Sequence, residues 1–309
     1  MTFGQLRTFL EVSRHGSIRA AAASLMVTEP SVSATVTSLS HEIGVDLLQR
    51  DGRGIRLTAA GLQLAKYAAE ILGLAEQASS RVREAGGKTG RLHLAAVTTA
   101  GEHVLPPVLK LFKEQQPKVQ IWMEVGNRVS LFEYLYSRQA DLAIGGRPPA
   151  DSKIAGEPFL ENRLLIVSAP DHPLAKKRAL EPAQLANQTW LLRESGSGTR
   201  EALEEFQKKH HIEPGGTMTL GSNGAVKHAA IAGLGITMIS THAIAAELAS
   251  GTLARLRVPG TPLKREWFVN YLADTPPQGS VLEFLRLLRS PAARRAIDQW
   301  FGPAKKFVA

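Results

Sequence analysis

One run of the sequence has the composition of an anion-binding loop. Residues 193–200 read Arg-Glu-Ser-Gly-Ser-Gly-Thr-Arg, after an apolar stretch of strand length and before a helical pattern. Glycines let backbone N–H groups converge, hydroxyl groups add donors, and a helix N-terminus contributes partial positive charge. The alternative is a plain flexible connection, because Gly/Ser loops are common in α/β proteins. The binding residues expected here are Ser195, Gly196, Ser197, Gly198, Thr199 and Arg200.

Other expected strand ends carry similar groups. If these strands are parallel neighbours, their ends meet at one edge of a sheet and line a common cleft. Arg147 and Arg200 would hold a carboxylate or phosphate there through paired hydrogen bonds, although ordinary surface arginines fit the pattern as well. The further residues that we assign to this cleft are Thr98, Thr99, Ala100, Gly146, Arg147, Ser222 and Asn223.

The sequence lacks the motifs of common catalytic and metal sites. It contains no G-x-x-x-x-G-K-[ST], no complete G-x-G-x-x-G, no G-x-S-x-G and no H-E-x-x-H. It has no cysteine, which excludes disulfides, thiolate catalysis, zinc fingers and iron–sulfur clusters. We therefore expect no catalytic residue, no cofactor and no metal ion, and hence a protein that is not an enzyme.

The first 60 residues have the pattern of short helices joined by tight turns. Ser17 is placed to cap an alanine-rich helix over 18–25, and Thr28 and Pro30 begin a third helix. The apolar positions of the third helix are spaced 4, 3 and 4 residues apart, so we expect one buried stripe of Val32, Val36, Leu39 and Ile43. The opposite face is small and polar, as suits a DNA groove, and consists of Pro30, Ser33, Ala34, Thr37, Ser38 and His41.

Three arginines follow this third helix. Arg50, Arg53 and Arg56 surround two glycines between Leu47 and Leu57, a pattern that predicts a two-stranded hairpin with basic tips. Beside a helix-turn-helix such arginines contact the phosphates that flank the groove. An ordinary solvated hairpin is the alternative.

A single helical pattern then runs from Thr58 to Ala85. Its apolar residues alternate spacings of 4 and 3, a repeat typical of helices that pair: Leu64, Ala68, Ile71, Ala75, Ala78 and Val82. The stripe predicts a dimer, unless the helix packs against its own chain. Residues 86–90, Gly-Gly-Lys-Thr-Gly, end the helix and indicate a hinge.

Beyond residue 90 the pattern alternates between strand and helix, which predicts an α/β region. We expect strands at 92–97, 119–125, 141–145, 164–168, 189–192, 218–221 and 236–239. We expect helices at 103–115, 129–138, 199–210, 223–232, 241–249 and from 281 onward. Segments 161–164 and 264–268 fit crossings between two lobes, with a cleft between the lobes.

The composition and net charge limit the classes of molecule that the protein could bind. The 309 residues are 44% hydrophobic and 21% charged, as in globular proteins, with a net charge of +9. The first 60 residues carry six basic and five acidic groups, whereas residues 86–309 carry 28 and 20. This excess fits nucleic-acid binding and equally attraction of a small anion. No run approaches the ~18 apolar residues of a membrane span, and charges at residues 7, 11 and 14 exclude a signal peptide, so we expect a cytoplasmic protein without membrane contact.

Two regions carry a family resemblance. The N-terminal sequence LRTFLEVSRHGSIRAAAASLMVTEPSVSATVTSLSHEIGVDLLQRDGRGIRLTAAG is similar over its full length to the signature of the LysR-type bacterial transcriptional regulators. Within that family, the carbon-fixation (Calvin-cycle) operon regulators have segments similar to EVGNR (124–128), DLAIGGRPP (141–149), RESGSGTR (193–200) and GSNGAVKHAAIAGLGITMIS (221–240). The Gly-Ser-Gly-Thr-Arg run also occurs in relatives that control sulfur or nitrogen assimilation.

The resemblance implies an α/β fold with an all-α, winged N-terminal domain. It places a winged helix-turn-helix at 1–60, a linker dimerisation helix and hinge at 58–87, and an effector-binding domain like the periplasmic binding proteins at 88–309. Lobe I of that domain is expected at about 91–162 and 268–309, and lobe II at about 163–267. The implied DNA-binding residues are Ser17, Arg19, Thr28, Glu29, Pro30, Ser31, Ser33, Ala34, Thr37, Ser38, Arg50, Arg53 and Arg56.

The third helix departs from the family pattern. Glu29, Ala34, Thr35 and Ser40 stand where the family usually has Gln, Arg, Gln and Glu, and Gly224 replaces a usual Glu. Short side chains make fewer paired contacts with base edges, so groove shape and phosphate contacts should matter more. Glu29 still offers an acceptor for a cytosine amino group.

The sequence thus predicts a regulator that binds promoter DNA and senses a small anionic metabolite, either a phosphorylated sugar or a carboxylic acid. Ligand binding would favour one arrangement of the lobes and be transmitted through the linker-helix dimer. The resemblance also implies a homotetramer, bent DNA and contact with RNA polymerase. Two other classes remain: an anion-binding enzyme or solute-binding protein that shares the cleft fold, and an architectural DNA protein that binds no ligand.

Overall fold

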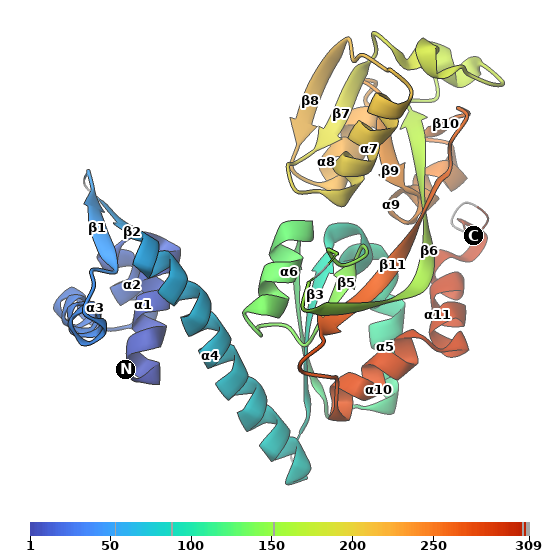
Figure 1. Cartoon of the computed structure of the whole chain (residues 1–309). Helices are drawn as coiled ribbons and strands as arrows, with labels where there is room; N and C mark the ends of the chain where they lie inside the picture. Colours follow the sequence, from blue (N-terminus) through green and yellow to red (C-terminus); the bar gives the residue numbers. More distant parts are fainter. Residues whose placement is uncertain (53, 88, 151, 305, 307–309) are drawn as a thin grey trace. The chain divides into compact units, whose positions relative to one another are not determined.

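A computed structural model describes residues 1–52, 54–87, 89–150, 152–304 and 306. The chain divides into two compact units (Figure 1). The N-terminal unit comprises Met1–Lys88 together with Tyr136–Gln139, and the C-terminal unit comprises Thr89–Leu135 and Ala140–Ala309.

Three helices build the N-terminal unit: α1 (Phe3–His15), α2 (Ile18–Leu25) and α3 (Glu29–Ile43). Their buried residues form one apolar core of Phe9, Val12, Ala21, Ala22, Val32, Val36, Leu39 and Leu47. The stripe on α3 is one residue shorter than expected, because Ile43, the last residue of the helix, is 40% exposed.

Capping side chains start the first two helices, the second of them as the sequence predicts, but not the third. Thr2 and Gln5 form a capping box on α1, and Ser17 Oγ accepts a hydrogen bond from the Ala20 N–H at 3.3 Å. Thr28 occupies the N-cap position of α3, yet its side chain makes no capping hydrogen bond. The start of α3 is fixed instead by the Thr28 carbonyl, which accepts from the backbone N–H groups of Ser31 and Val32.

The predicted hairpin is present, with β1 (Leu48–Asp51) antiparallel to β2 (Gly54–Leu57). Arg50 lies opposite Ile55, whereas Arg56 lies opposite Gln49. Directly opposed residues of a hairpin share a face, and successive residues of a strand alternate between faces. The side chains of Arg50 and Arg56 therefore point to opposite faces of the hairpin. Arg53 lies outside the described residues.

The long helix is also present as α4 (Ala59–Ala85), and its N-cap residue Thr58 accepts a hydrogen bond from the Gly61 N–H at 3.0 Å. The expected stripe is partly covered within the unit: Ala68 is buried, while Val82 is 73% exposed. Other apolar side chains along α4 are open to solvent, namely Leu62, Tyr67 and Leu74. Pairing of α4 with a partner helix therefore stays a prediction, and the exposed apolar residues of α4 offer a surface for it.

One mixed sheet runs through the C-terminal unit in the order β10-β6-β11-β5-β3-β4, with β9 paired to β6. β3 is parallel to β4 and β5, and the separate pair β7-β8 is parallel, as βαβ units require; the pairs formed by β6 and β11 are antiparallel. The strands are β3 (Arg91–Val97), β4 (Gln120–Gly126), β5 (Leu142–Gly145), β6 (Ile154–Ser168), β7 (Thr189–Arg193), β8 (Gly216–Leu220), β9 (Thr237–Ser240), β10 (Ala254–Leu256) and β11 (Leu263–Leu272).

Helices alternate with these strands as expected, and a π-helix at Ala100–Val104 precedes the first of them. The helices are α5 (Leu105–Gln115), α6 (Arg128–Tyr136), α7 (Gly198–Lys209), α8 (Asn223–Ile231), α9 (Thr241–Ser250), α10 (Gly279–Leu288) and α11 (Pro291–Phe301). Short 3-10 turns occupy Pro173–Lys176, Pro182–Leu185 and Gly302–Ala304.

The expected strand 164–168 is only the end of a 15-residue strand, β6, and β11 spans the predicted crossing at 264–268. These two strands pair along their length, with a register shift between Trp267 and Phe268. They connect separate apolar cores. We call lobe I the part built on β3, β4, β5, α5, α6, α10 and α11, and lobe II the part built on β7, β8, β9, β10, α7, α8 and α9.

Candidate functional site

A small cleft of about 50 Å³ lies between lobe I and lobe II. Six residues assigned to it from the sequence line it, from both lobes: Thr98, Thr99, Gly146, Ser197, Gly198 and Thr199. A space of this size holds one or two water molecules. The structure therefore has its lobes close together.

The Gly/Ser loop docks against the start of α6. Gly196 has a φ of +80°, which favours glycine, and a Cβ there would lie 3.3 Å from Asn127 Nδ2. The Gly196 carbonyl accepts a hydrogen bond from the Arg128 N–H at 3.2 Å. Ser197, the N-cap residue of α7, is buried but makes no side-chain cap. The first turn of α7 therefore presents its backbone N–H groups without a capping side-chain oxygen.

A buried chain of hydrogen bonds connects the two lobes beside the cleft. The Asn223 amide, at the start of α8, donates to Thr99 Oγ1 at 2.7 Å, and Asn223 Oδ1 accepts from Arg193. Arg193 is only 7% exposed and also makes two 2.7 Å hydrogen bonds with the Glu194 carboxylate. Burial opposes ionisation of Glu194, but the hydrogen bonds from Arg193 outweigh it and lower the pKa of this carboxyl.

Two further guanidinium groups line the cleft. Arg265, on β11, donates to the Gly198 carbonyl at 2.6 Å, and Arg128, on α6, donates to the Arg147 carbonyl at 2.8 Å. Within the described part of the chain neither forms an ion pair with a carboxylate. Burial, and then the charge of Arg128, lower the pKa of Arg265. The charges of Glu201 and Glu205 partly offset this shift, and Glu266 also lines the cleft. Because the two guanidinium groups form no ion pair, they remain available to an anion.

Trp267 completes the cleft from β11. It is 6% exposed, and its indole Nε1 has no hydrogen-bond partner in the described structure. An indole N–H is a donor only, so the buried Nε1 of Trp267 is an unsatisfied donor in the described structure. The four tryptophans of the chain all lie in the C-terminal unit.

Several residues assigned from the sequence do not line the cleft. Ala100 is buried in the π-helix, and Ser195 is exposed. Gly196 shapes the Gly/Ser loop, and Ser222 caps α8. Asn223 acts through Thr99 as described. Arg147 points to a different cavity, and Arg200 pairs with Glu204 at 2.7 Å.

Sequence reasoning missed Asn127, Arg128, Asn162, Arg193, Arg265, Glu266 and Trp267, which all line the cleft. Two signals were present. Asn127 and Arg128 belong to the EVGNR segment, and Arg193 begins the Gly/Ser run itself. Arg265 lies in the predicted lobe crossing between Lys264 and Glu266, and in such a charged run no pattern distinguishes one residue from its neighbours.

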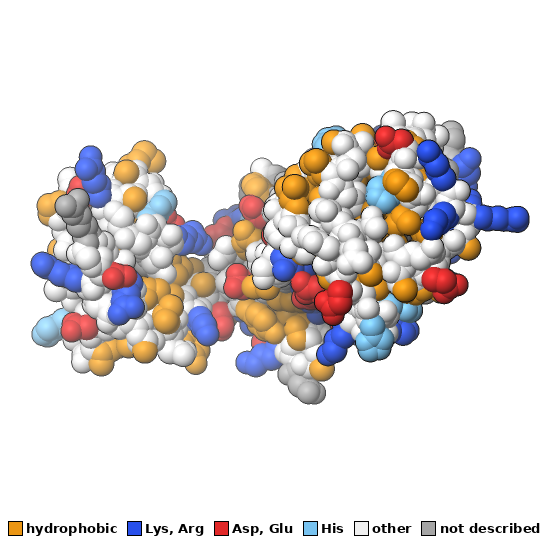
Figure 2. Space-filling view, turned by 90° about the horizontal axis from the view of Figure 1, so that it is seen from above, with side chains coloured by type: hydrophobic (Ala, Val, Ile, Leu, Met, Phe, Trp, Pro, Cys, Tyr) orange, Lys and Arg blue, Asp and Glu red, His pale blue; other side chains and the backbone are white. Residues whose placement is uncertain are grey.

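The polar face of α3 is exposed as predicted. Thr28, Glu29, Pro30, Ser31, Ser33, Ala34, Thr37 and Ser38 all lie open to solvent, while Val32, Val36 and Leu39 are buried beneath them. Arg19, whose side chain is 87% exposed, approaches Glu29 at 4.0 Å. Figure 2 shows basic side chains on several sides of the N-terminal unit, between hydrophobic and acidic ones. Ser17 is half-buried and serves as the cap of α2.

The described residues contain no cluster of three His, Asp or Glu side chains suited to a metal ion. None of the helices in the described structure is both long enough and apolar enough to span a membrane.

Two family models together match most of the chain. Residues 3–62 match the bacterial regulatory helix-turn-helix of the lysR family, and residues 85–293 match the LysR substrate binding domain. A RuBisCO operon transcriptional regulator of Acidithiobacillus ferrooxidans is 38% identical over 288 residues, 92% of this chain and 93% of that protein.

Solved structures of LysR family proteins are also similar to this chain. The regulatory domain of CcmR from Synechocystis PCC6803, solved in complex with 2-PG, is 33% identical, with a TM-score of 0.62; the match covers 65% of this chain and 96% of that one. CbnR, a LysR family transcriptional regulator, matches 96% of this chain and 99% of its own at a TM-score of 0.68 and 23% identity, a likeness of fold. The predicted fold class, an α/β chain with a helix-turn-helix, is confirmed.

Proposed function

Because the chain belongs to the LysR family of DNA-binding transcriptional regulators, we propose that its cleft senses a small anion that carries both a phosphate and a carboxylate. The proposal keeps the division into a DNA-binding domain at 1–60, a linker helix and hinge at 58–87 and an effector-binding domain at 88–309. It treats the protein as a sensor without catalysis.

The observation that carries the proposal is the pair Arg128 and Arg265. Both guanidinium groups line the cleft, and neither forms an ion pair with a carboxylate of the described residues. The hydroxyl groups of Thr98, Thr99 and Thr199 and the N-terminus of α7 add neutral donors on the other walls. An anion with two charged ends uses both sets of donors, which a neutral metabolite does not.

The relatives narrow the ligand class. CcmR was solved with 2-PG, 2-phosphoglycolate, a two-carbon acid that has a phosphate and a carboxylate. Since the cleft here is about 50 Å³, such a ligand enters only when the lobes separate or the Thr99–Asn223 bridge yields. The ligand thus has a different affinity for the closed and the open arrangement, which is what a sensor needs.

The proposed function also includes target genes and partner molecules. The matched RuBisCO operon regulator supports control of carbon-fixation genes by this chain. We place a dimer at α4, assembling into a tetramer on bent promoter DNA, and contact with RNA polymerase in the cytoplasm. The exposed face of α3 then enters the groove and Arg50, Arg53 and Arg56 contact phosphates.

The test is a titration of the full-length protein with 2-phosphoglycolate, followed by tryptophan fluorescence, since Trp267 lines the cleft. Arg265→Gln should raise the Kd about 10-fold or more, because a charge-assisted hydrogen bond contributes roughly 1.5–3 kcal/mol. Arg286→Gln, which removes an exposed arginine of α10, is the matched control and should bind like the wild type. Equal affinity in the two variants would remove Arg265 from the site.

A second readout separates the rival classes. In a gel-retardation assay with the promoter of a carbon-fixation operon, 2-phosphoglycolate should change the mobility or the footprint of the complex. A saturable ligand effect without DNA binding would favour a solute-binding protein. DNA binding with no effect of any phosphorylated or carboxylic ligand would favour an architectural protein.

A further inference from the structure

Part of the positive charge of the C-terminal unit gathers in one patch of lobe II. Residues 86–309 carry 28 basic and 20 acidic groups, an excess to which the cleft contributes only two guanidinium groups without an ion pair. Two short segments supply the patch: the run that ends the 3-10 turn Pro173–Lys176, and β10 with the residue after it. Figure 2 shows Lys and Arg side chains gathered at the right of the C-terminal unit. We call the following five residues the lobe II patch: Lys176, Lys177, Arg178, Arg255 and Arg257.

Backbone contacts hold the two segments of the patch side by side. β10 is the edge strand of the mixed sheet, and the 3-10 turn packs against it. The Leu180 N–H, just after the Lys-Lys-Arg run, donates to the Arg257 carbonyl at 2.9 Å. Leu256 is buried, so the alternation of a strand turns Arg255 and Arg257 to the same outer face. Partial burial, and then the charge of Arg257, lower the pKa of Arg255.

The cations of the lobe II patch are open to solvent and to a partner. All five side chains are exposed, and none forms an ion pair with a carboxylate of the described residues. The acidic groups closest to the Lys-Lys-Arg run in the sequence are Asp171 and Glu181, one on each side. Five cations therefore stand against two carboxylates, which makes the surface electropositive.

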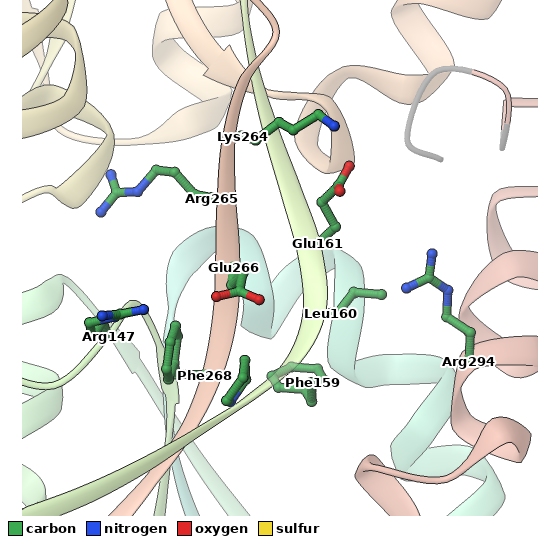
Figure 3. A pocket seen from close by; sticks show the side chains of 10 residues that line it. Arg147, Phe159, Leu160, Glu161, Lys264, Arg265, Glu266, Phe268 and Arg294 are labelled. Atoms are coloured by element: carbon green, nitrogen blue, oxygen red, sulfur yellow. The ribbon is translucent and has the colours of Figure 1, made fainter.

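The surroundings of the lobe II patch favour a phosphate backbone over a small molecule or a protein. None of its residues lines the cleft or the cavity in Figure 3, around which Arg147, Arg265 and Arg294 lie, so no cavity wall encloses a small anion there. The large apolar side chains that are exposed in the described structure all lie outside 171–181 and 254–260. Protein interfaces have an apolar core, whereas phosphate groups need only accessible cations and polar donors.

We propose that the lobe II patch binds the phosphate backbone of double-stranded DNA, outside the groove proposed for α3. The helix-turn-helix keeps a duplex at high local concentration around the rest of the chain. Duplex DNA carries one negative charge per ~1.7 Å of its axis, so several of the five cations can contact phosphates at once. Such contacts read no sequence and add affinity for DNA that extends beyond the operator. This surface is additional to the DNA-binding residues proposed above.

The first test measures how salt affects the binding of the full-length protein to a promoter fragment that extends well beyond the operator. Each phosphate contact contributes ~0.9 to the slope of log affinity against log salt concentration. The triple variant Lys176→Gln, Lys177→Gln and Arg178→Gln should therefore lower this slope by ~2 when at least two of the three contact phosphates. Because the three side chains are exposed, the variant should fold, which an unfolding midpoint equal to that of the wild type would verify.

The matched control removes the same charge from exposed positions of lobe I. The triple variant Lys110→Gln, Lys118→Gln and Arg286→Gln should keep the wild-type slope. An unchanged slope in the patch variant would overturn the proposal. An equal fall in both triple variants would also overturn it, since the effect would then come from net charge.

A second test locates the DNA directly. The chain has no cysteine, so Lys177→Cys gives one thiol that can carry an iron chelate, which cleaves DNA strands close to it. Cleavage should appear outside the operator, and the same label on Lys110→Cys should give none there. Absence of cleavage from position 177, or equal cleavage from both positions, would contradict the contact. Loss of transcription in the patch variant with an unchanged salt slope would assign the lobe II patch to a protein partner instead.

Discussion

His242, on α9, is a buried imidazole whose surroundings disfavour the charged form. Its side chain is 3% exposed, and rings of Trp267 and Phe301 lie 6.3 and 5.4 Å from it. Burial is the main cause that lowers its pKa to about 4, and the charges of His103 and Arg294 act in the same direction. His242 is therefore neutral in the folded protein at pH values near 7.

This shift predicts a loss of stability in acid. Above pH ~6.5 the imidazole is neutral in both the folded and the unfolded chain. As the pH falls from ~6.5 to ~4, the imidazole is protonated in the unfolded chain but stays neutral in the folded chain. The free energy of unfolding therefore falls by about 3 kcal/mol. Urea unfolding of the full chain, followed by tryptophan fluorescence, should show this slope. His242→Gln should flatten it, whereas the exposed control His41→Gln should retain it; an unaltered slope in His242→Gln contradicts the assignment.

The Thr99–Asn223 hydrogen bond is one of the contacts that join lobe I to lobe II at the cleft, beside the one between the Arg128 N–H and the Gly196 carbonyl. Removing one partner leaves a buried polar group unsatisfied, which costs about 1–3 kcal/mol. We therefore expect Thr99→Val and Asn223→Ala each to destabilise the C-terminal unit by that amount. In the double variant the losses should fall short of their sum by at least ~0.5 kcal/mol, since both remove one bond. Additive losses would show that the lobes do not share this bond in solution.

At the level of elements, prediction from the sequence succeeded where one face of an element is buried. The helices from α5 to α9 and the parallel strands have apolar residues at the right period, and the Gly/Ser run identified the start of α7. β6 and β11 were not predicted at full length. Their crossing segments, Glu-Asn-Arg and Lys-Arg-Glu, are polar or charged at every position, so neither face is apolar. For the same reason Arg265 was missed.

The hairpin β1-β2 is the element that the phosphate hypothesis depends on. Arg50 and Arg56 leave opposite faces of it, and Arg56 lies against Gln49 across the ribbon. If both contact phosphates, Arg50→Gln and Arg56→Gln should each weaken binding on every DNA sequence and lower the salt slope by ~1. Fluorescence anisotropy at several salt concentrations measures this slope. A variant with an unchanged slope would remove its arginine from the phosphate contacts, and Arg7→Gln, on α1, serves as the control.

For the whole molecule, the proposed dimer depends on α4. Leu74 and Val82 are 49% and 73% exposed, and together with Leu62 and Tyr67 they leave apolar surface along α4 that a partner helix would cover. Leu74→Glu with Val82→Glu should therefore shift the protein to monomers in light scattering, while Gln63→Glu, an exposed polar position of the same helix, should not. Because paired half-sites bind through effective concentration, the monomer should lose about 100-fold or more in affinity for a palindromic operator.

The cleft, in contrast, is lined in this structure by residues of one chain, from Val97 to Trp267. The monomeric variant should accordingly bind 2-phosphoglycolate with the affinity of the wild type. Its DNA complex should lose the response to the ligand, since a change in one chain no longer alters the spacing of two helix-turn-helix units. Loss of ligand binding in the monomer would mean that a second copy completes the cleft. A ligand response that survives in the monomer would mean that the signal reaches DNA within one chain.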